Sequence, residues 1–274
     1  MATLLDSRDK KIRGSKTVVS FETTGGDSWK EWDRFIAIEG KHAYHIGNVC
    51  GTCEFFFERL ENPFKPVEIR ETIEGLNTGL TSIDQETLDS VSKIIPNGKY
   101  KVLLLEILPR LIKLTSSDDY FATDQKDLWE DAGSFGLPHY PKIQYYRGTD
   151  QEIGREGKIF EFINPLVPPN RLKQDRIEFY KLKFEAGLKP TAIALAVLDV
   201  KQPAEWPDDL DPKITEHWCF AHYLLDGHHK VFAASETNKP ITILTFLSID
   251  KGVSTKENIK ELIETIKNTV PNKG

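Results

Sequence analysis

The second half of the chain shows a regular rhythm of apolar and polar positions, which predicts alternating strands and helices. Four apolar runs have the length and the branched residues typical of buried strands. They are residues 158–164, 192–200, 218–225 and 241–249. Between these runs, apolar residues recur at helical spacing and predict helices at 175–186 and 228–237. A terminal helix follows, with Thr255 as its N-cap and with the apolar residues Ile259, Leu262, Ile263, Ile266 and Val270.

The first half is less regular and predicts fewer elements. Residues 18–21 predict a short edge strand, and residues 82–85 resemble a capping box that starts an amphipathic helix ending at Pro96. Residues 100–108 are almost continuously apolar, which fits a buried strand, but their leucines and the apolar continuation after Pro109 favour a helix. Residues 116–157 are rich in aromatic side chains, so we expect an ordered connection whose aromatics contribute mainly to a core.

These elements predict an α+β fold in three parts. The N-terminal region, residues 1–150, is α+β and contains a Cys-x-x-Cys and the aromatic-rich connection. Residues 151–250 form a mixed sheet with helices, and residues 251–274 contain the C-terminal helix. A length of 274 residues, of which 39% are hydrophobic and 28% charged, fits one large or two ordinary soluble domains.

Charge and hydropathy exclude several classes of partner. A net charge of −6 argues against non-specific nucleic-acid binding, which depends on a surplus of lysine and arginine. No apolar run approaches the roughly 18 residues of a membrane span, and the N-terminus has charges where a signal peptide needs an apolar stretch. Three cysteines do not make a secreted disulfide framework. We therefore expect a cytoplasmic protein.

The Cys-x-x-Cys at Cys50 and Cys53 has three interpretations. Two thiolates at this spacing reach one ion, and His42 and His45 lie close enough in sequence to complete a tetrahedral zinc site. A second interpretation is a thioredoxin-type dithiol before a helix, although no buried strand is predicted to precede it. In the third, the cysteines are small, buried and unreactive.

A second candidate site lies at the turn from Asp226 to Lys230. An apolar strand meets Asp226 and Gly227, and His228, His229 and Lys230 then begin a helix. A helix N-terminus exposes unpaired N–H groups and the positive end of the helix dipole, so it favours anions. The turn is either a phosphate pocket or an ordinary strand–turn–helix corner with polar residues at its start.

The order of elements over residues 158–250 resembles the ParB/sulfiredoxin-like fold. Four motifs account for the resemblance: Asn164-Pro165, Pro169-Asn170-Arg171, the Gly-x-x-Pro at 187–190, and Asp-Gly-His-His-Lys at 226–230. The resemblance implies a nucleotide, such as ATP, ADP or CTP with magnesium, bound through its phosphates. Members of the family include the CTP-binding partition proteins, the sulfiredoxins and kinases of small molecules.

The resemblance also implies roles for individual residues. His228, His229 and Lys230 would contact phosphates, Gly227 would allow close backbone approach, and Asn170 would position Arg171 as a further contact. Asp226 would cap the turn or orient metal or substrate. Asp226 and His228 are the candidate catalytic residues, and Asp226 or Glu236 could act as a general base. His228 occupies the place of the sulfiredoxin cysteine, and few residues follow Asp250, so neither cysteine repair nor chromosome partition is expected.

Three functions remain open at this stage. The first is a nucleotide-dependent phosphotransferase or hydrolase acting on a small molecule. The second is a non-catalytic nucleotide-sensing or protein-interaction module with a structural zinc site. The third is a redox protein that uses Cys50 and Cys53, with Cys219 simply buried.

Overall fold

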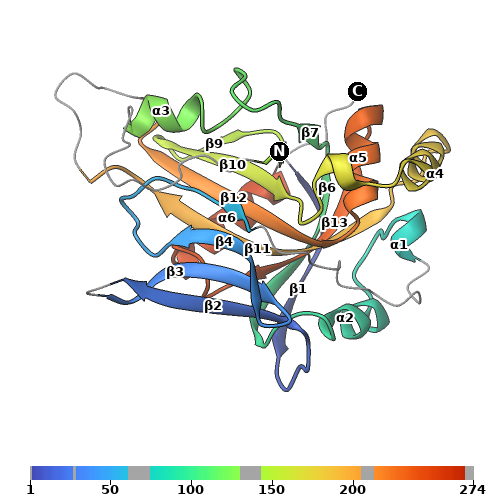
Figure 1. Cartoon of the computed structure of the whole chain (residues 1–274), viewed down its shortest axis with the longest axis horizontal. Helices are drawn as coiled ribbons and strands as arrows, with labels where there is room; N and C mark the ends of the chain where they lie inside the picture. The colour runs from blue at the N-terminus through green and yellow to red at the C-terminus, as the bar shows by residue number, and fades with distance from the viewer. Residues whose placement is uncertain (1, 27–28, 61–74, 130–142, 205–212, 269–274) are drawn as a thin grey trace.

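A computed structural model of the chain describes residues 2–26, 29–60, 75–129, 143–204 and 213–268 (Figure 1). Within these ranges the fold is α+β, as predicted, and is built on one large mixed sheet. None of the described helices is long and apolar enough to cross a membrane.

The large sheet combines strands from both halves of the chain. Its order is β1 (Thr3–Ile12), β6 (Gly98–Ile107), β13 (Ile241–Ser248), β11 (Thr191–Lys201), β12 (Glu216–Asp226), β10 (Gly157–Asn164), β8 (Tyr146–Arg147) and β7 (Arg110–Leu111), with β9 (Gln151–Ile153) beside β10. Strands β10 and β12 are parallel, as are β11 and β13, and the other pairs are antiparallel. Because β6 pairs with β13, the predicted boundary at residue 150 divides a single sheet.

A smaller antiparallel sheet covers one face of the large sheet (Figure 1). It contains β2 (Val19–Gly26), β3 (Trp29–Ile38), β4 (Lys41–Asn48) and β5 (Glu58–Arg59) in that order. The edge strand predicted at residues 18–21 is the start of β2. The buried Tyr44 hydroxyl crosses between the sheets and lies 3.2 Å from the carbonyl oxygen of Asn164.

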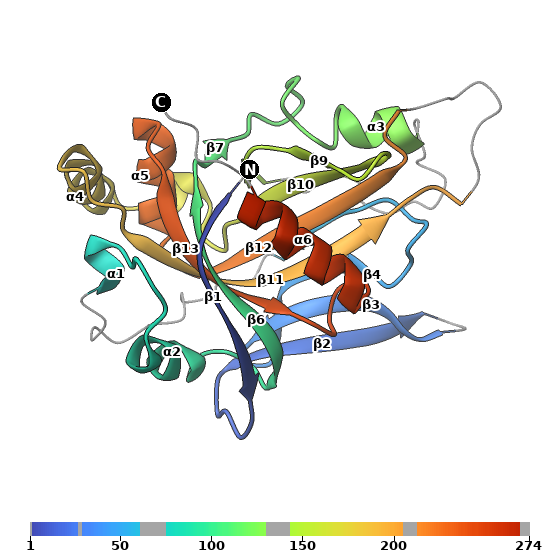
Figure 2. The same ribbon diagram turned by 180° about the vertical axis from the view of Figure 1, so that it is seen from behind.

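Helices cover the other face of the large sheet. They are α4 (Gln174–Glu185), α5 (His228–Thr237) and α6 (Lys256–Asn268), and Figure 2 shows α6 lying across this face. Three further helices, α1 (Gly75–Thr78), α2 (Gln85–Ser92) and α3 (Asp124–Trp129), lie in the first half. Thr255 caps α6 as predicted, because its Oγ1 accepts from Asn258 N–H at 3.1 Å, whereas Val270 lies outside the described residues.

The strands and helices predicted within residues 158–268 are confirmed closely, but two predictions in the first half are wrong. Residues 100–108 belong to β6 rather than to a helix, because Leu103 and Leu105 face the helical layer while Val102 and Leu104 face the small sheet. A strand that is buried on both faces lacks the alternation of apolar and polar residues by which a strand is recognised in the sequence. Helix α2 is capped by Asp84 rather than by Ser82, since Asp84 Oδ1 accepts from Thr87 N–H at 2.7 Å.

The predicted aromatic connection is ordered where the structure describes it. Tyr145 and Tyr146 are buried in the core, as expected, and Trp129 ends α3. Phe135, His139 and Tyr140 lie outside the described residues.

A buried ion pair joins the two sheets. Arg34 of β3 donates from its two terminal nitrogens to the Asp199 carboxylate of β11, at 2.6 and 3.0 Å. Arg34 also donates to the carbonyls of Ile46 and Lys251, and Asp199 Oδ1 accepts from Val253 N–H. Burial alone would raise the pKa of Asp199, but the Arg34 guanidinium outweighs burial and holds this pKa below its usual value.

We predict that Arg34→Met lowers the free energy of unfolding by about 3–5 kcal/mol, because it leaves the Asp199 charge buried and unpaired. The contribution of the pair is fully present above the unfolded pKa of about 3.9 and is lost as the pH falls through the lower folded pKa. Urea unfolding from pH 7 to pH 3 measures both effects.

The exposed pair between Lys213 and Glu152, with side chains 76% and 64% exposed, provides the control. Glu152→Gln should change stability by less than about 0.5 kcal/mol. Equal effects of Arg34→Met and Glu152→Gln would contradict the structural role of the buried pair.

Candidate functional site

The predicted strand–turn–helix corner is present, and Gly227 makes it tight. Strand β12 ends at Asp226 and α5 begins at His228, so one residue reverses the chain. Gly227 has φ +94°, and a Cβ atom there would lie 2.6 Å from Ala192 Cβ and 2.8 Å from Ala192 Cα. A side chain at residue 227 would therefore clash with β11.

The side chain of His228 points into the protein. Its Nε2 accepts a hydrogen bond from Leu166 N–H at 3.0 Å, in the loop that follows β10. Burial lowers the pKa of His228 to about 4, so the imidazole is neutral at pH 7 and acts as an acceptor. In this geometry His228 holds the 165–173 loop against α5 and presents no positive charge to a ligand.

Lys230 is also turned inward. Its Nζ donates to the Thr191 carbonyl at 2.8 Å and lies 3.6 Å from Asp226 Oδ2. Burial lowers the pKa of Lys230, and the Asp226 carboxylate opposes this shift. Lys230 thus fastens the first turn of α5 to the start of β11.

His229 joins the N-terminus of α5 to the N-terminus of α4. Its Nε2 accepts from Lys173 N–H at 3.1 Å, and Lys173 is the N-cap residue of α4. Neither helix has a side-chain cap, since Gly227 and Lys173 make no capping hydrogen bond. Two helix N-termini therefore meet at one place, which Figure 1 shows as α4 and α5 side by side. We call this place the α4–α5 corner.

Exposed cations surround the α4–α5 corner. Asn170 and Arg171 lie in a short 3-10 turn (Pro169–Arg171), and both are exposed. Lys173 and Arg176 are exposed at the start of α4. Burial is the main cause that lowers the pKa of His229; the charges of Arg176 and Lys173 lower it further, and the Asp175 and Asp226 carboxylates oppose the shift. Lys173 and Arg176 did not stand out in the sequence, although both fall at the start of the predicted helix. Their proximity to α5 is a tertiary contact that helical spacing does not reveal.

The candidate general bases are separated by the length of α5. Asp226 precedes the helix, its side chain is 35% exposed, and it lies beside Lys230. Glu236 is exposed in the last turn of the helix. Glu236 is eight positions after His228 along the helix, a rise of roughly 12 Å. Only Asp226 is therefore placed to act at the α4–α5 corner.

Cys50 and Cys53 form a disulfide. Its loop is tied to the rest of the protein, because Cys50 O accepts from Lys201 Nζ and Thr52 O accepts from the Trp129 indole. Residues 54–60, which directly follow Cys53, contain the short strand β5 and no helix, so they do not supply the helix N-terminus that lowers a thiol pKa in thioredoxin-type sites. The disulfide is nevertheless the oxidised form that the redox interpretation requires.

The two histidines of the predicted zinc site contact carboxylates. His42 Nε2 lies 3.0 Å from Glu22 Oε2, and His45 Nε2 lies 3.1 Å from Asp33 Oδ1. No group of three or more His, Cys, Asp or Glu side chains in the described part of the chain is arranged to hold a metal ion. This arrangement does not fit the zinc site predicted from the sequence, because the cysteine sulfurs are bonded to each other. Burial raises the pKa of the Cys219 thiol, which keeps it protonated within the core.

We predict that Gly227→Ala lowers the free energy of unfolding by about 3 kcal/mol, as the sum of a left-handed backbone cost and a clash with Ala192. Gly187→Ala is the matched control, since Gly187 has φ +79° but nothing within 4 Å of its Cβ position. The control should cost about 1 kcal/mol, the backbone term alone. Urea unfolding compares them, and equal losses would show that the turn does not press on β11.

No protein family, no curated protein and no solved structure matches the chain.

Proposed function

We propose that the chain binds a phosphate-bearing ligand of nucleotide size at the α4–α5 corner. The observation that supports this proposal is the meeting of two helix N-termini without side-chain caps, joined through His229. Each N-terminus offers unpaired N–H groups and roughly half a positive charge from the helix dipole. Together they favour an anion more strongly than either helix does alone.

The charges for this role come from Arg171, Lys173 and Arg176. All three are exposed beside the corner, whereas His228 and Lys230 are occupied by Leu166 and Thr191. Arginine guanidinium groups match phosphate oxygens in a two-pronged geometry. In this proposal, His229 keeps the helix termini together, and the backbone N–H groups of α5 contact the phosphate.

ATP, ADP and CTP, each with magnesium, are the ligands to test first. Asp226 is the carboxylate that would orient the metal, because it is partly exposed at the end of β12. The inward position of His228 favours binding without catalysis over phosphotransfer. A phosphotransferase remains the second candidate, with Asp226 as its general base, and would be distinguished by phosphorylated product.

We predict that calorimetric titration with ATP, ADP and CTP, with and without magnesium, detects binding by the unmodified protein. Arg171→Glu and Arg176→Glu should each weaken it at least about tenfold, because each replaces a favourable charge by a repulsive one. Arg155→Glu should leave affinity unchanged, since Arg155 is exposed in the turn before β10.

Failure of all three nucleotides and of inorganic phosphate to bind would reject the proposal. Equal affinity losses for Arg155→Glu and Arg176→Glu would instead indicate a general charge effect. Far-ultraviolet circular dichroism of each variant checks that the fold is retained.

A further inference from the structure

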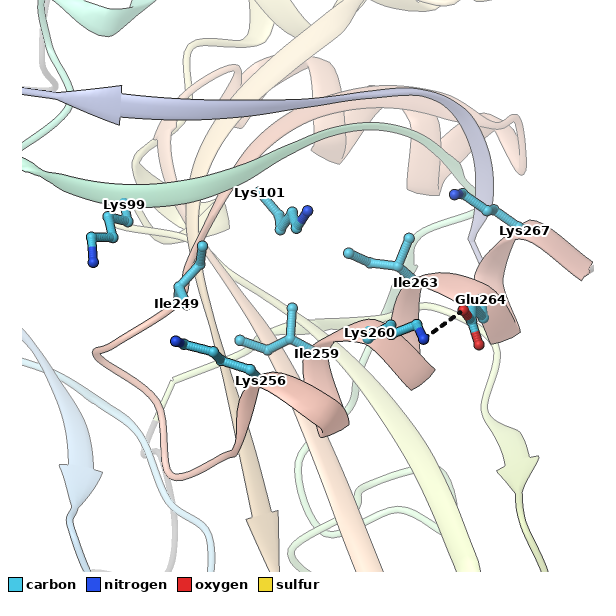
Figure 3. Close-up of a pocket in the computed structure, with 9 residues that line it drawn as sticks. All are labelled: Lys99, Lys101, Ile249, Lys256, Ile259, Lys260, Ile263, Glu264 and Lys267. Atoms are coloured by element: carbon cyan, nitrogen blue, oxygen red, sulfur yellow. Dashed lines mark ion pairs between the residues drawn. The ribbon is translucent and has the colours of Figure 1, made fainter.

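A lysine-lined groove lies between α6 and the start of β6 (Figure 3). Lys99 and Lys101 are two residues apart in β6, so both face the helical layer. Lys256, Lys260 and Lys267 lie along one side of α6. The groove has a volume of about 570 Å³, within the range of small-molecule sites. We call it the lysine groove.

Few carboxylates balance these lysines. Lys101 pairs with the exposed Asp9 at 2.6 Å, and Lys260 lies 3.8 Å from Glu264. Within the described ranges, no carboxylate lies at ion-pair distance from Lys99, Lys256 or Lys267. Five lysines against two carboxylates leave a local excess of three positive charges in a chain whose net charge is −6.

The positive charge is concentrated further by the pairing of β1 with β6. Lys11 stands directly opposite Lys99 in the register of the two strands. Like charges at opposed positions destabilise a sheet, so this pair costs folding energy unless an anion offsets it. The pair is consistent with an anionic ligand near Lys99.

The floor of the lysine groove is apolar. Ile249, Ile259 and Ile263 lie between the two rows of lysines, as Figure 3 shows. Ile259 and Ile263 are almost completely buried in the core between α6 and the sheet, whereas Ile249 is only half-buried. The apolar floor would contribute nothing to the binding of an inorganic anion, because apolar surface favours contact with apolar groups.

We infer that the lysine groove binds a free, single-chain anionic amphiphile, with a carboxylate or phosphate-monoester head on a linear alkyl or acyl chain. The chain lies along the isoleucines and the head contacts lysines of β6 and α6. From Lys256 to Lys267 the helix rises roughly 16 Å, the length of a medium alkyl chain. An apolar floor between two rows of lysines suits one chain rather than the surface of a bilayer.

The lysine groove is separate from the α4–α5 corner. Asp226 is level with Leu244 of β13, because both pair with Ile193. The groove begins at Ile249, five residues further along, which corresponds to roughly 16 Å of extended chain. Its occupant can therefore be tested independently of any ligand at the corner.

The test is calorimetric titration of the full chain with dodecyl phosphate below its micelle concentration, in low salt. We expect one site per chain, with affinity that falls as salt is added. Dodecanol and inorganic phosphate should each bind at least about tenfold more weakly, because each lacks one of the two recognised parts. Equal binding of either compound would overturn the inference, as would stronger binding to vesicles of anionic phospholipid.

Variants assign the binding to the lysine groove. Lys99→Glu and Lys256→Glu should each weaken the binding of dodecyl phosphate at least about tenfold. Ile249→Ser should weaken this binding about threefold to tenfold. Lys239→Glu should have no effect on affinity, because Lys239 is exposed just before the start of β13 and the lysine groove lies at the other end of this strand. Unchanged affinity in Lys99→Glu and Lys256→Glu, with circular dichroism like the unmodified protein, would place the ligand elsewhere.

Discussion

The absence of a side chain at residue 227 is the constraint on which the α4–α5 corner depends. Because glycine has no Cβ atom, the chain can turn from β12 into α5 while its backbone packs directly on Ala192. From that starting point Lys230 reaches the Thr191 carbonyl, and His228 reaches Leu166 N–H. His229 then faces the start of α4 and accepts from Lys173 N–H. Three side chains that could serve a ligand instead fix two helices and a loop on the sheet.

The proposed anion site follows from this use of side chains. Since His228 and Lys230 are buried, the positive field at the corner comes from two helix dipoles and from exposed cations on the start of α4. The backbone donors are fixed in place, because Lys230 and His228 hold α5 to β11 and to the loop after β10, and His229 joins α4 to α5. A rigid set of donors loses little entropy on binding, which is an advantage for a small phosphate ligand.

The sequence predicted the second half of the fold well because its signals are local. Helix α6 has a clear apolar period, β10 and β12 are nearly continuous apolar runs, and Gly187 and Gly227 mark the end of α4 and the start of α5. Strand β1 was missed, since its polar residues lie on an exposed edge, and the pairing of β6 with β13 depends on contacts between distant parts of the chain. The leucines of β6 favour a helix by sequence alone, and they form a strand because both faces of the sheet are covered.

Sites were harder to predict than elements for a related reason. A sequence shows that Lys230 is basic but not that its side chain turns inward. It also gives no sign that Lys99 and Lys256 face the same groove, since they are more than 150 residues apart. The Cys-x-x-Cys spacing is compatible with zinc, with a dithiol and with the disulfide observed here. A disulfide is unusual in a reducing cytoplasm, so the oxidation state of this pair and the location of the protein have to be established together.

In the proposed function, the N-terminal amides of α4 and α5 form one anion site. Amide chemical shifts of isotope-labelled protein, recorded while ATP is added, test it most directly. We expect the amides of His228, His229 and Gln174 to shift together with one dissociation constant, and those of Thr237 and Arg155 to stay in place. Shifts confined to one helix, or spread evenly over the protein, would contradict it.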